Sequence, residues 1–543
     1  MALNAAAQGH SGLDVISDGA ITEFYNLMEE AMKVSEVMPG RYNIITSPSY
    51  ANPCPVAESS FTTVDISTGQ PNVVSLDNTY ITANLKVHLT VDAAHTYTDL
   101  NPCVYFVGFK SSLDAISKYQ IYHNGKMIYD QPFCSEEAYV LQTIVPDHVK
   151  YTRPKQYTSH ENAWNFDSNV CGTYVTLDKT GANKSFDAII PLKIDITQFL
   201  TFGEFRYLPG FFGTWGIRMW FSSQNLVICP VDPARTIGVA APTSLQRRFT
   251  QIGHKFKGIT NFVKSTGVFT VADVTFTTNG CITERVMLNS AQFALQFPVY
   301  DSLKARYFTD PLAIPVCAML YGRFSGNMSK DAGFSSTYNA AISCCEALFL
   351  LPYVNDQHHT VCRNPRWKGA FLNVSGYGNF PQQYVDTVPS GDDCEAFTRF
   401  HTLTLDALNI NNSDLMSMTK ELAASLCSNY VNQTLVTSAG TTYTATENSF
   451  NSEDDTNFLF GIPFANSDDF QGGLTTNGQA QMKFQTNGSD MQLPAEVENP
   501  ALGITAMFLV DRAILLRTLP YSEQPQVKIV EEKLRIAAPP PQA

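Results

Sequence analysis

The sequence predicts an all-β chain that contains two large β-sandwiches in tandem. The chain has 543 residues, and a single hydrophobic core stops growing at roughly 250–300 residues, so at least two domains are expected. The 35 Phe and 24 Tyr residues, with Thr, Asn and Ser between the apolar runs, are typical of strands joined by polar turns. All-β domains often reach about 200–250 residues, so two of them account for the length.

The clearest strand signals lie in the first half of the chain. In residues 79–91, TYITANLKVHLTV, apolar and polar residues alternate, which is the pattern of a half-buried strand. Residues 116–130, ISKYQIYHNGKMIYD, hold Asn124-Gly125 between two β-forming runs. Both residues of such a turn need positive φ, so this pair predicts a hairpin. The first sandwich is assigned to residues 60–231, because the alternating run at 217–222 is followed by Pro230.

The second half repeats these patterns with longer polar insertions. Strand-like runs occupy residues 284–297, 479–488 and 505–520, and turn-rich tracts such as 431–457 separate them. The second sandwich is therefore assigned to residues 275–520. Residues 412–430 carry apolar residues on one helical face, which predicts a short helix.

Both ends of the chain differ from the sandwiches. Residues 1–59 form an N-terminal arm in which 21–32 show helical spacing of apolar residues. This amphipathic helix either docks on its own domain or reaches a neighbouring subunit. Residues 521–543 end in a Pro-rich segment and are interpreted as a tail. The N-terminus lacks the features of a signal peptide and no run of 18 apolar residues occurs, so neither export nor membrane spanning is expected.

One basic stretch interrupts a chain whose net charge is −14. Residues 232–274 are assigned to a connection between the sandwiches, and this connection is first interpreted as solvated. The alternative is a surface that faces a polyanion or an acidic neighbour. The basic residues concerned are Arg235, Arg247, Arg248, Lys255, Lys257 and Lys264.

No constellation in the sequence predicts catalysis, a cofactor or a metal. The phosphate-binding, zinc-protease, hydrolase-elbow and EF-hand patterns are absent. His358-His359 is interpreted as a surface loop, because adjacent residues point in different directions on a regular element. Asp392-Asp393, which follow Pro389-Ser390-Gly391, are interpreted as a solvated turn and not as a calcium site. The 12 cysteines contain no C-x-x-C pair, and Cys344-Cys345 lie in an apolar stretch, so they are expected to be small buried hydrophobes.

Low charge favours a protein that assembles. Charged residues make up only 16% of the chain, against roughly 25% in ordinary soluble domains. A protein that buries much of its surface against copies of itself tolerates such a surface, because charge is depleted at interface cores. The acidic balance argues against a protein that coats nucleic acid along its whole surface.

Several segments resemble parts of one family of viral proteins. Residues 112–131, SLDAISKYQIYHNGKMIYDQ, look like the segment of polinton-like virus, virophage and adintovirus capsid proteins in which an Asn-Gly hairpin joins two strands. Residues 189–222 are similar to the family's IPL…F…LP stretch near the end of the first jelly roll. Residues 472–488 and 508–517 are similar to the final strands of the second jelly roll. The chain thus resembles the double jelly-roll major capsid proteins of double-stranded DNA viruses.

This resemblance implies two eight-stranded jelly rolls side by side and a structural, non-enzymatic role in the virion. Three copies would form a pseudo-hexagonal homotrimeric capsomer, and capsomers would tile an icosahedral shell assembled inside the infected host cell. The implied partners are further copies of the chain, penton proteins and minor capsid or cement proteins, with genome or an internal membrane at the inner face. No small-molecule substrate is implied.

Two other functions stay open at this point. The first is a carbohydrate-binding or glycoside-processing β-sandwich, because paired carboxylates far apart in the sequence can meet in a fold. The second is a capsid or spike protein of another viral lineage.

Overall fold

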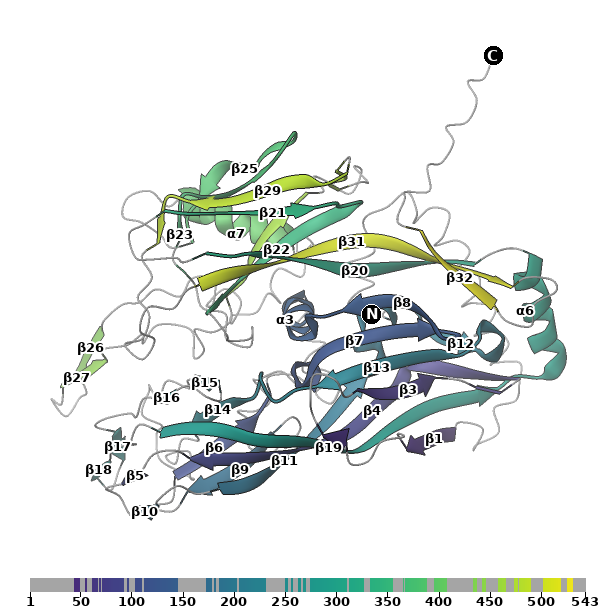
Figure 1. Ribbon diagram of the computed structural model, residues 1–543, viewed down its shortest axis with the longest axis horizontal. Coiled ribbons are helices and arrows are strands. Elements are labelled where there is room, and N and C mark those ends of the chain that lie inside the picture. Colours follow the sequence, from purple (N-terminus) through teal and green to yellow (C-terminus); the bar gives the residue numbers. More distant parts are fainter. Residues whose placement is uncertain are drawn as a thin grey trace.

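The computed structural model divides into two β-sandwich modules that lie one above the other in Figure 1. The residues that it describes are 43–48, 54–55, 61–66, 68–69, 71–91, 95–96, 103–109, 112–144, 172–177, 180–181, 185–202, 205–230, 250–251, 255–256, 262–264, 267–269, 274–309, 312–326, 333–354, 365, 367–387, 395–407, 433–436, 442–445, 458–464, 473–476, 478–489, 502–518 and 525–530.

The first module has two sheets whose main paths hold four strands each, in the orders β1-β19-β4-β11 and β3-β13-β7-β8. Short strands β2, β12 and β16 pair beside the first path. The eight main strands are β1 (Asn43–Pro48), β3 (Thr62–Ile66), β4 (Asn72–Val91), β7 (Ile116–His123), β8 (Lys126–Gln131), β11 (Ser185–Asp195), β13 (Trp215–Phe221) and β19 (Val274–Ala294). The short ones are β2 (Cys54–Pro55), β12 (Tyr207–Pro209) and β16 (Lys255–Phe256).

The second module repeats this plan, with paths β20-β31-β22-β28 and β21-β29-β24-β25. Its main strands are β20 (Leu312–Phe324), β21 (Phe334–Ala340), β22 (Cys345–Val354), β24 (Ala370–Val374), β25 (Gly378–Val385), β28 (Phe460–Pro463), β29 (Ala480–Thr486) and β31 (Leu502–Thr518). A further strand, β32 (Pro525–Val530), pairs with β31.

Both modules have the same topology. When the eight main strands of a module are numbered along the chain, one sheet runs 1-8-3-6 and the other 2-7-4-5. Strand pairs 1·8, 2·7, 3·6 and 4·5 are thus neighbours, as in one long antiparallel ribbon rolled so that successive pairs alternate between the two sheets. This is the jelly-roll arrangement. The prediction of two tandem eight-stranded jelly rolls is confirmed.

Helices connect the strands at corresponding places. Helix α3 (Cys134–Ile144) follows strand five of the first module, and α7 (Glu395–Ala407) follows strand five of the second. Helix α6 (Phe297–Thr309) joins the two modules. The single-turn 3₁₀ helices are η1 (Ser112–Ala115), η2 (Ile196–Gln198), η3 (Leu200–Phe202) and η4 (Gly210–Phe212).

Long connections of the first module form a sheet of their own, in the order β15-β14-β6-β9. Its strands come from the 3–4, 5–6 and 7–8 connections, which leave one end of a jelly roll. They are β6 (Cys103–Gly108), β9 (Gly172–Leu177), β14 (Val227–Pro230) and β15 (Thr250–Gln251). Small two-stranded pairs are β5 (His95–Thr96) with β10 (Thr180–Gly181), β17 (Phe262–Lys264) with β18 (Gly267–Phe269), β23 (Trp367–Lys368) with β30 (Gly488–Ser489), and β26 (Gln433–Val436) with β27 (Thr442–Ala445).

Period-two alternation in the sequence determines which side chains fill the sandwiches. Ile81, Leu85 and Leu89 are fully buried on β4, while the polar residues between them lie at the surface. The hairpin between β7 and β8 turns at Asn124 (φ 47°) and Gly125 (φ 80°), so that prediction is confirmed. The buried apolar residues of both modules form one continuous cluster, which indicates that the modules pack firmly on each other.

The structure corrects the predicted boundaries. Residues 274–294 form β19, which pairs with β4 and β1 of the first module, so a second sandwich starting at residue 275 is wrong. The basic stretch 232–274 consequently lies between two strands of the first module. Strand β1 lies within the predicted arm, and β32 lies within the predicted tail. The error arose because strand eight pairs with strand one. This pairing joins distant parts of the chain and leaves no pattern in the local sequence.

Two predicted helices, at residues 21–32 and 412–430, lie outside the described residues. The predicted burial of Cys344 and Cys345 is confirmed, and Cys134 and Cys281 are buried as well. Burial raises the pKa of the Cys281 thiol to about 12, which suits the role of a small apolar side chain.

Candidate assembly interface

The two modules meet where β8 of the first lies against β20 of the second (Figure 1) and where α3 contacts Phe458, just before β28. Strand β20 is the last strand on its sheet path, so one edge of its backbone has no neighbouring strand among the described residues. Side chains of the first module bind that edge instead. The Met319 amide donates to Tyr129 Oη at 3.3 Å, and Gln131 Nε2 donates to the Met319 carbonyl at 3.2 Å. These hydrogen bonds occupy backbone groups of an edge strand that could otherwise pair with a strand of another chain.

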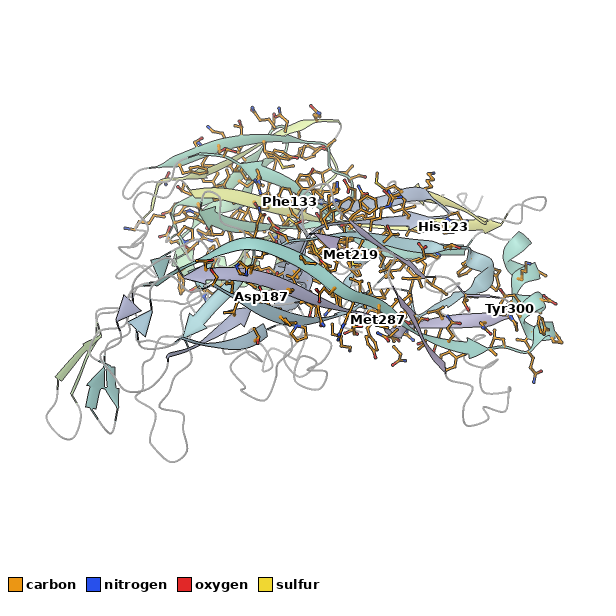
Figure 2. The ribbon with its side chains drawn as sticks, turned by 60° about the horizontal axis from the view of Figure 1, so that its bottom comes forward. His123, Phe133, Asp187, Met219, Met287 and Tyr300 are labelled. Carbon is orange, nitrogen blue, oxygen red and sulfur yellow. The ribbon has the colours of Figure 1, made fainter. Side chains whose placement is uncertain are left out.

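Aromatic packing extends this contact. The rings of Phe133 and Tyr321 lie edge to face with centroids 4.6 Å apart, and the Arg323 guanidinium lies 4.5 Å from the Phe133 ring centre. On α3, the Tyr139 hydroxyl donates to the Phe458 carbonyl at 2.9 Å. Figure 2 shows Phe133 next to the strands of the second module. The interface therefore combines backbone capping, ring packing and a helix contact.

A buried carboxylate organises the capping side chains. Glu137 on α3 is 1% exposed. Its Oε1 accepts a hydrogen bond from Tyr119, and its Oε2 accepts from Tyr129 at 2.9 Å and from Gln131. Tyr129 and Gln131 are the two side chains that bind Met319, so Glu137 holds both in position. Burial, and then the charge of Glu137, raises the pKa of Tyr119 and Tyr129 well above the usual value, so both phenols stay protonated donors.

Sequence reasoning did not identify Glu137. The available signal was a pair of glutamates, Glu136 and Glu137, in the first turn of a short helix whose other residues are mostly apolar. Acidic residues favour a helix N-terminus, and that explanation would have sufficed. Only the fold shows that both side chains are buried.

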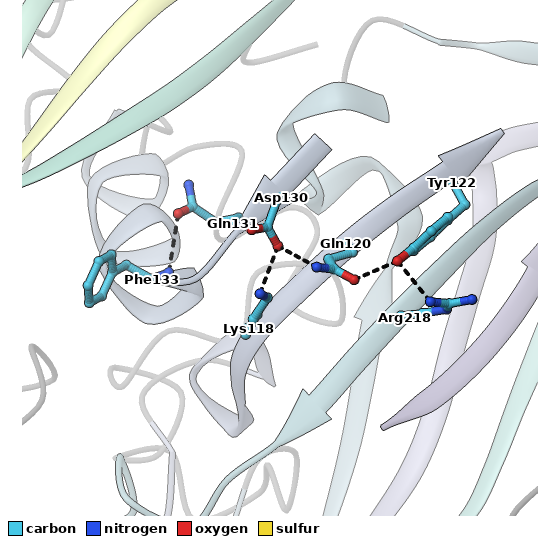
Figure 3. Close-up of polar contacts among 7 residues, drawn as sticks. All are labelled: Lys118, Gln120, Tyr122, Asp130, Gln131, Phe133 and Arg218. Atoms are coloured by element: carbon cyan, nitrogen blue, oxygen red, sulfur yellow. Dashed lines mark hydrogen bonds and ion pairs between the residues drawn. The ribbon is translucent and has the colours of Figure 1, made fainter. Parts of the chain in front are cut away.

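The outer face of sheet β3-β13-β7-β8 carries a chain of polar contacts (Figure 3). Asp130 accepts from Lys118 at 3.1 Å and from Gln120 at 2.8 Å. Tyr122 donates to Gln120 at 2.7 Å and accepts from Arg218 at 2.8 Å. The chain crosses three strands and pairs opposite charges, which favours the native register.

The corresponding face of the second module is nearly uncharged. Its outward residues alternate with buried ones along β21, β24 and β29, and Lys483 is the one charged residue among them. They are Ser335, Thr337, Asn339, Phe371, Asn373, Gln481, Lys483 and Gln485. Depletion of charge is the compositional mark of an interface core.

An exposed ion-pair cluster lies on the other sheet of the first module, at Asp187 in Figure 2. Asp187 binds Lys86 at 3.0 Å and His88 at 2.8 Å. The hydrogen bond from His88, and then that from Lys86, holds the pKa of Asp187 below its usual value, while Asp187 raises the pKa of Lys86. All three side chains are solvated, so the cluster is an ordinary surface contact between strands.

The predicted basic residues are only partly placed. Lys255 lies in β16 and Lys264 in β17, whereas Arg235, Arg247, Arg248 and Lys257 lie outside the described residues. His358, His359, Asp392 and Asp393 also lie outside them. Within the described part of the chain, no group of three or more His, Cys, Asp and Glu residues could hold a metal ion. None of the helices described there is long and apolar enough to cross a membrane.

Known proteins resemble this chain in fold but not in sequence. No protein-family model and no curated protein matches the chain. A solved chain of the Sputnik virophage is similar, with 11% identity, 93% of each chain covered and a TM-score of 0.49. The mavirus major capsid protein is 10% identical, with 90% of each chain covered and a TM-score of 0.47. The Faustovirus major capsid protein is 10% identical, with 89% of this chain and 92% of that chain covered and a TM-score of 0.36.

Proposed function

We propose that this chain is the major structural subunit of a viral capsid and that three copies form a pseudo-hexagonal capsomer. The observation that carries the proposal is the repetition of one jelly-roll topology in two modules joined by an internal interface. Three such chains supply six similar modules, which approximate a six-sided tile. Closed rotational symmetry then lets one interface be used repeatedly. The resemblance of residues 112–131 and 189–222 to capsid proteins agrees with this role.

In this role the chain would act through its surfaces and not through a reactive centre. Capsomers would tile an icosahedral shell, with penton, minor capsid or cement proteins as further partners. Genome or an internal membrane would face the inner side, and assembly would take place in the infected host cell. The nearly uncharged outer face of the second module supports contact with neighbours.

Sedimentation velocity of the purified full chain at micromolar concentration tests the proposal. A species with the mass of three chains is expected, together with particles of hexagonal outline in negatively stained electron micrographs. A stable monomer at that concentration would overturn the proposal. A hydrolysis screen over glycosides separates the enzymatic alternative, since turnover lost on changing one carboxylate would favour that alternative.

The basic stretch has a separate proposed role in assembly or packaging. Neutralising Arg247, Arg248, Lys255 and Lys257 together is expected to change particle yield or nucleic-acid content while the soluble yield of the chain stays the same, because exposed charges seldom affect stability. The measurements are particle counts and the absorbance ratio at 260 and 280 nm. Loss of soluble protein would instead assign these residues a structural role.

A further inference from the structure

The repeated topology gives each module two comparable edges. Strand five and its following helix form one edge, which is β8 with α3 in the first module and β25 with α7 in the second. Strand one forms the other, which is β1 in the first module and β20 in the second. Inside the chain, β8 contacts β20, and α3 contacts Phe458 of the second module. Strands β25 and β1 lie on opposite sides of the molecule in Figure 1, and no described strand covers either of them in this way.

The surface at β25 is exposed but firmly held. Four exposed residues, three in β25 and one in the turn just before it, are here called the β25 patch: Tyr377, Gln382, Gln383 and Tyr384. Tyr384 is 52% exposed and Tyr377 is 43% exposed. The Tyr384 carbonyl accepts a 2.7 Å hydrogen bond from Arg399 of α7, and the Tyr377 hydroxyl donates to the Thr475 carbonyl at 2.8 Å. Tyrosine side chains supply a large contact area at a low cost in conformational entropy.

A register irregularity pushes part of this patch outward. Leu372 of β24 pairs with Phe380, and Ala370 pairs with Val385, so the four residues 381–384 oppose a single residue of β24. Extra residues of this kind leave the ladder and redirect side chains, as β-bulges do. Among the described strands, β25 pairs with β24 alone, so its other edge has no strand beside it.

The chemistry of the patch matches that of the covered edge. In the first module, a tyrosine and a glutamine, Tyr129 and Gln131, bind the free backbone edge of strand one of the next module. The β25 patch offers the same two residue types, and it carries no charge. Hydroxyl and amide groups both donate and accept hydrogen bonds, so they suit the alternating amides and carbonyls of a strand edge.

We propose that the β25 patch of one copy docks on the β1 edge of the first module of a second copy, continuing the interface that already joins the two modules within the chain. Strand β1 pairs with β19 along its whole length, and among the described strands none pairs with its other edge. The contact is head to tail, and contacts of that kind generate a ring when the rotation closes. The inference rests on the proposed function and names the surface that it uses.

A charged substitution tests the patch. Tyr384→Arg is expected to raise the dissociation constant of the oligomer by about 30-fold or more, as for an aromatic hot spot at an interface, measured by sedimentation velocity over a concentration series. Ile189→Arg is the matched control, because Ile189 is 53% exposed on β11, away from both β1 and β25. It is expected to leave the dissociation constant unchanged. An unchanged oligomer with Tyr384→Arg would overturn the docking proposal.

Photocrosslinking identifies the partner surface without a substitution that weakens the oligomer. The full chain carrying photoreactive benzoylphenylalanine in place of Tyr384 is mixed with isotopically labelled wild-type chain and irradiated. Mixed-label crosslinks to residues 43–48 are expected, and crosslinks confined to other segments would overturn the inference. If the wild-type chain is monomeric, the proposed function itself fails. If the wild type is oligomeric but residue 384 contacts another segment, only this docking surface fails.

Discussion

Strand five of the first module and strand five of the second have the same place in the topology but different surroundings. At β8 the side chains of Tyr129 and Gln131 are buried against the second module. At β25 residues 382–384 are exposed. Helix α3 contacts the neighbouring module, whereas α7 packs against its own strands, with Thr404 accepting the Gly461 amide at 3.2 Å.

This difference shows that topology does not determine the use of an edge. Both edges offer hydrogen-bonding side chains, and what differs is whether a partner is present within the same chain. The covered edge contains a buried carboxylate that sets the geometry of its donors. The exposed edge instead has a bulge and an arginine bound to the backbone. A bulge protects an edge from pairing with another strand, so the proposed contact of this edge with a second copy relies on its exposed side chains.

The largest expected effects test whether the two modules are energetically independent. Trp215 and Trp367 are each fully buried in one module, Trp215 with Phe202 and Phe205, and Trp367 with Phe458 and Phe484. Trp215→Ala and Trp367→Ala are each expected to cost about 3–5 kcal/mol of unfolding free energy, because a large cavity is left. Hydrogen exchange measured by mass spectrometry should show faster exchange first in the substituted module. Equal acceleration in both modules by either change would show that they unfold as one unit.

The next effect concerns the covered edge. Glu137→Ala leaves the buried donors of Tyr119, Tyr129 and Gln131 without their acceptor, so the expected loss is about 3 kcal/mol, measured by chemical denaturation. Glu137→Gln should lose less but still weaken the edge, because its amide NH₂ faces donors. Glu395→Ala is the control: its exposed ion pair with Arg399 should contribute below about 0.5 kcal/mol. If Glu137→Ala and Glu395→Ala lowered the unfolding free energy equally, Glu137 would not stabilise this edge in the way described.

Histidines in the two modules predict a common acid response. Burial lowers the pKa of His123 in the first module and of His401 in the second below the usual 6.5. The unfolded chain therefore binds more protons below pH 6.5, and stability is retained above that pH and falls as the pH decreases. Each residue contributes a slope of at most about 1.4 kcal/mol per pH unit. His123→Asn should reduce the slope between pH 6.5 and 5, and an unaltered slope would exclude His123 as a cause.

The smallest effect compares the hairpins between strands four and five. Gly125 (φ 80°) and Gly376 (φ 86°) both occupy the left-handed region, and the space that a Cβ atom would fill is open at each. Gly125→Ala and Gly376→Ala are each expected to cost about 1 kcal/mol through backbone strain, measured by thermal unfolding. Gly69→Ala, where the space is open and φ is not positive, is the control with no expected loss.

Local pattern predicted the strands with clear alternation and the hairpin at Asn124-Gly125, because side-chain period and turn residues are properties of a few neighbouring positions. It also predicted that two sandwiches follow each other. It missed that residues 274–294 belong to the first sandwich, since β4 and β1, the main partners of β19, are more than 180 positions earlier in the sequence. It missed the role of Glu137, because Tyr129 and Gln131, the side chains that this carboxylate holds, bind Met319, which lies 188 to 190 positions later in the chain.

Alone, the sequence determined the β class, the two-module plan and the faces that each alternating strand buries, because those follow from periodicity and composition. The tertiary structure decided where the first module ends, which acid is buried and which strand-five edge is left exposed. Those features depend on pairs of residues brought together by the roll of an antiparallel ribbon. Contacts of that kind join residues far apart in the chain, so no local window of sequence contains them.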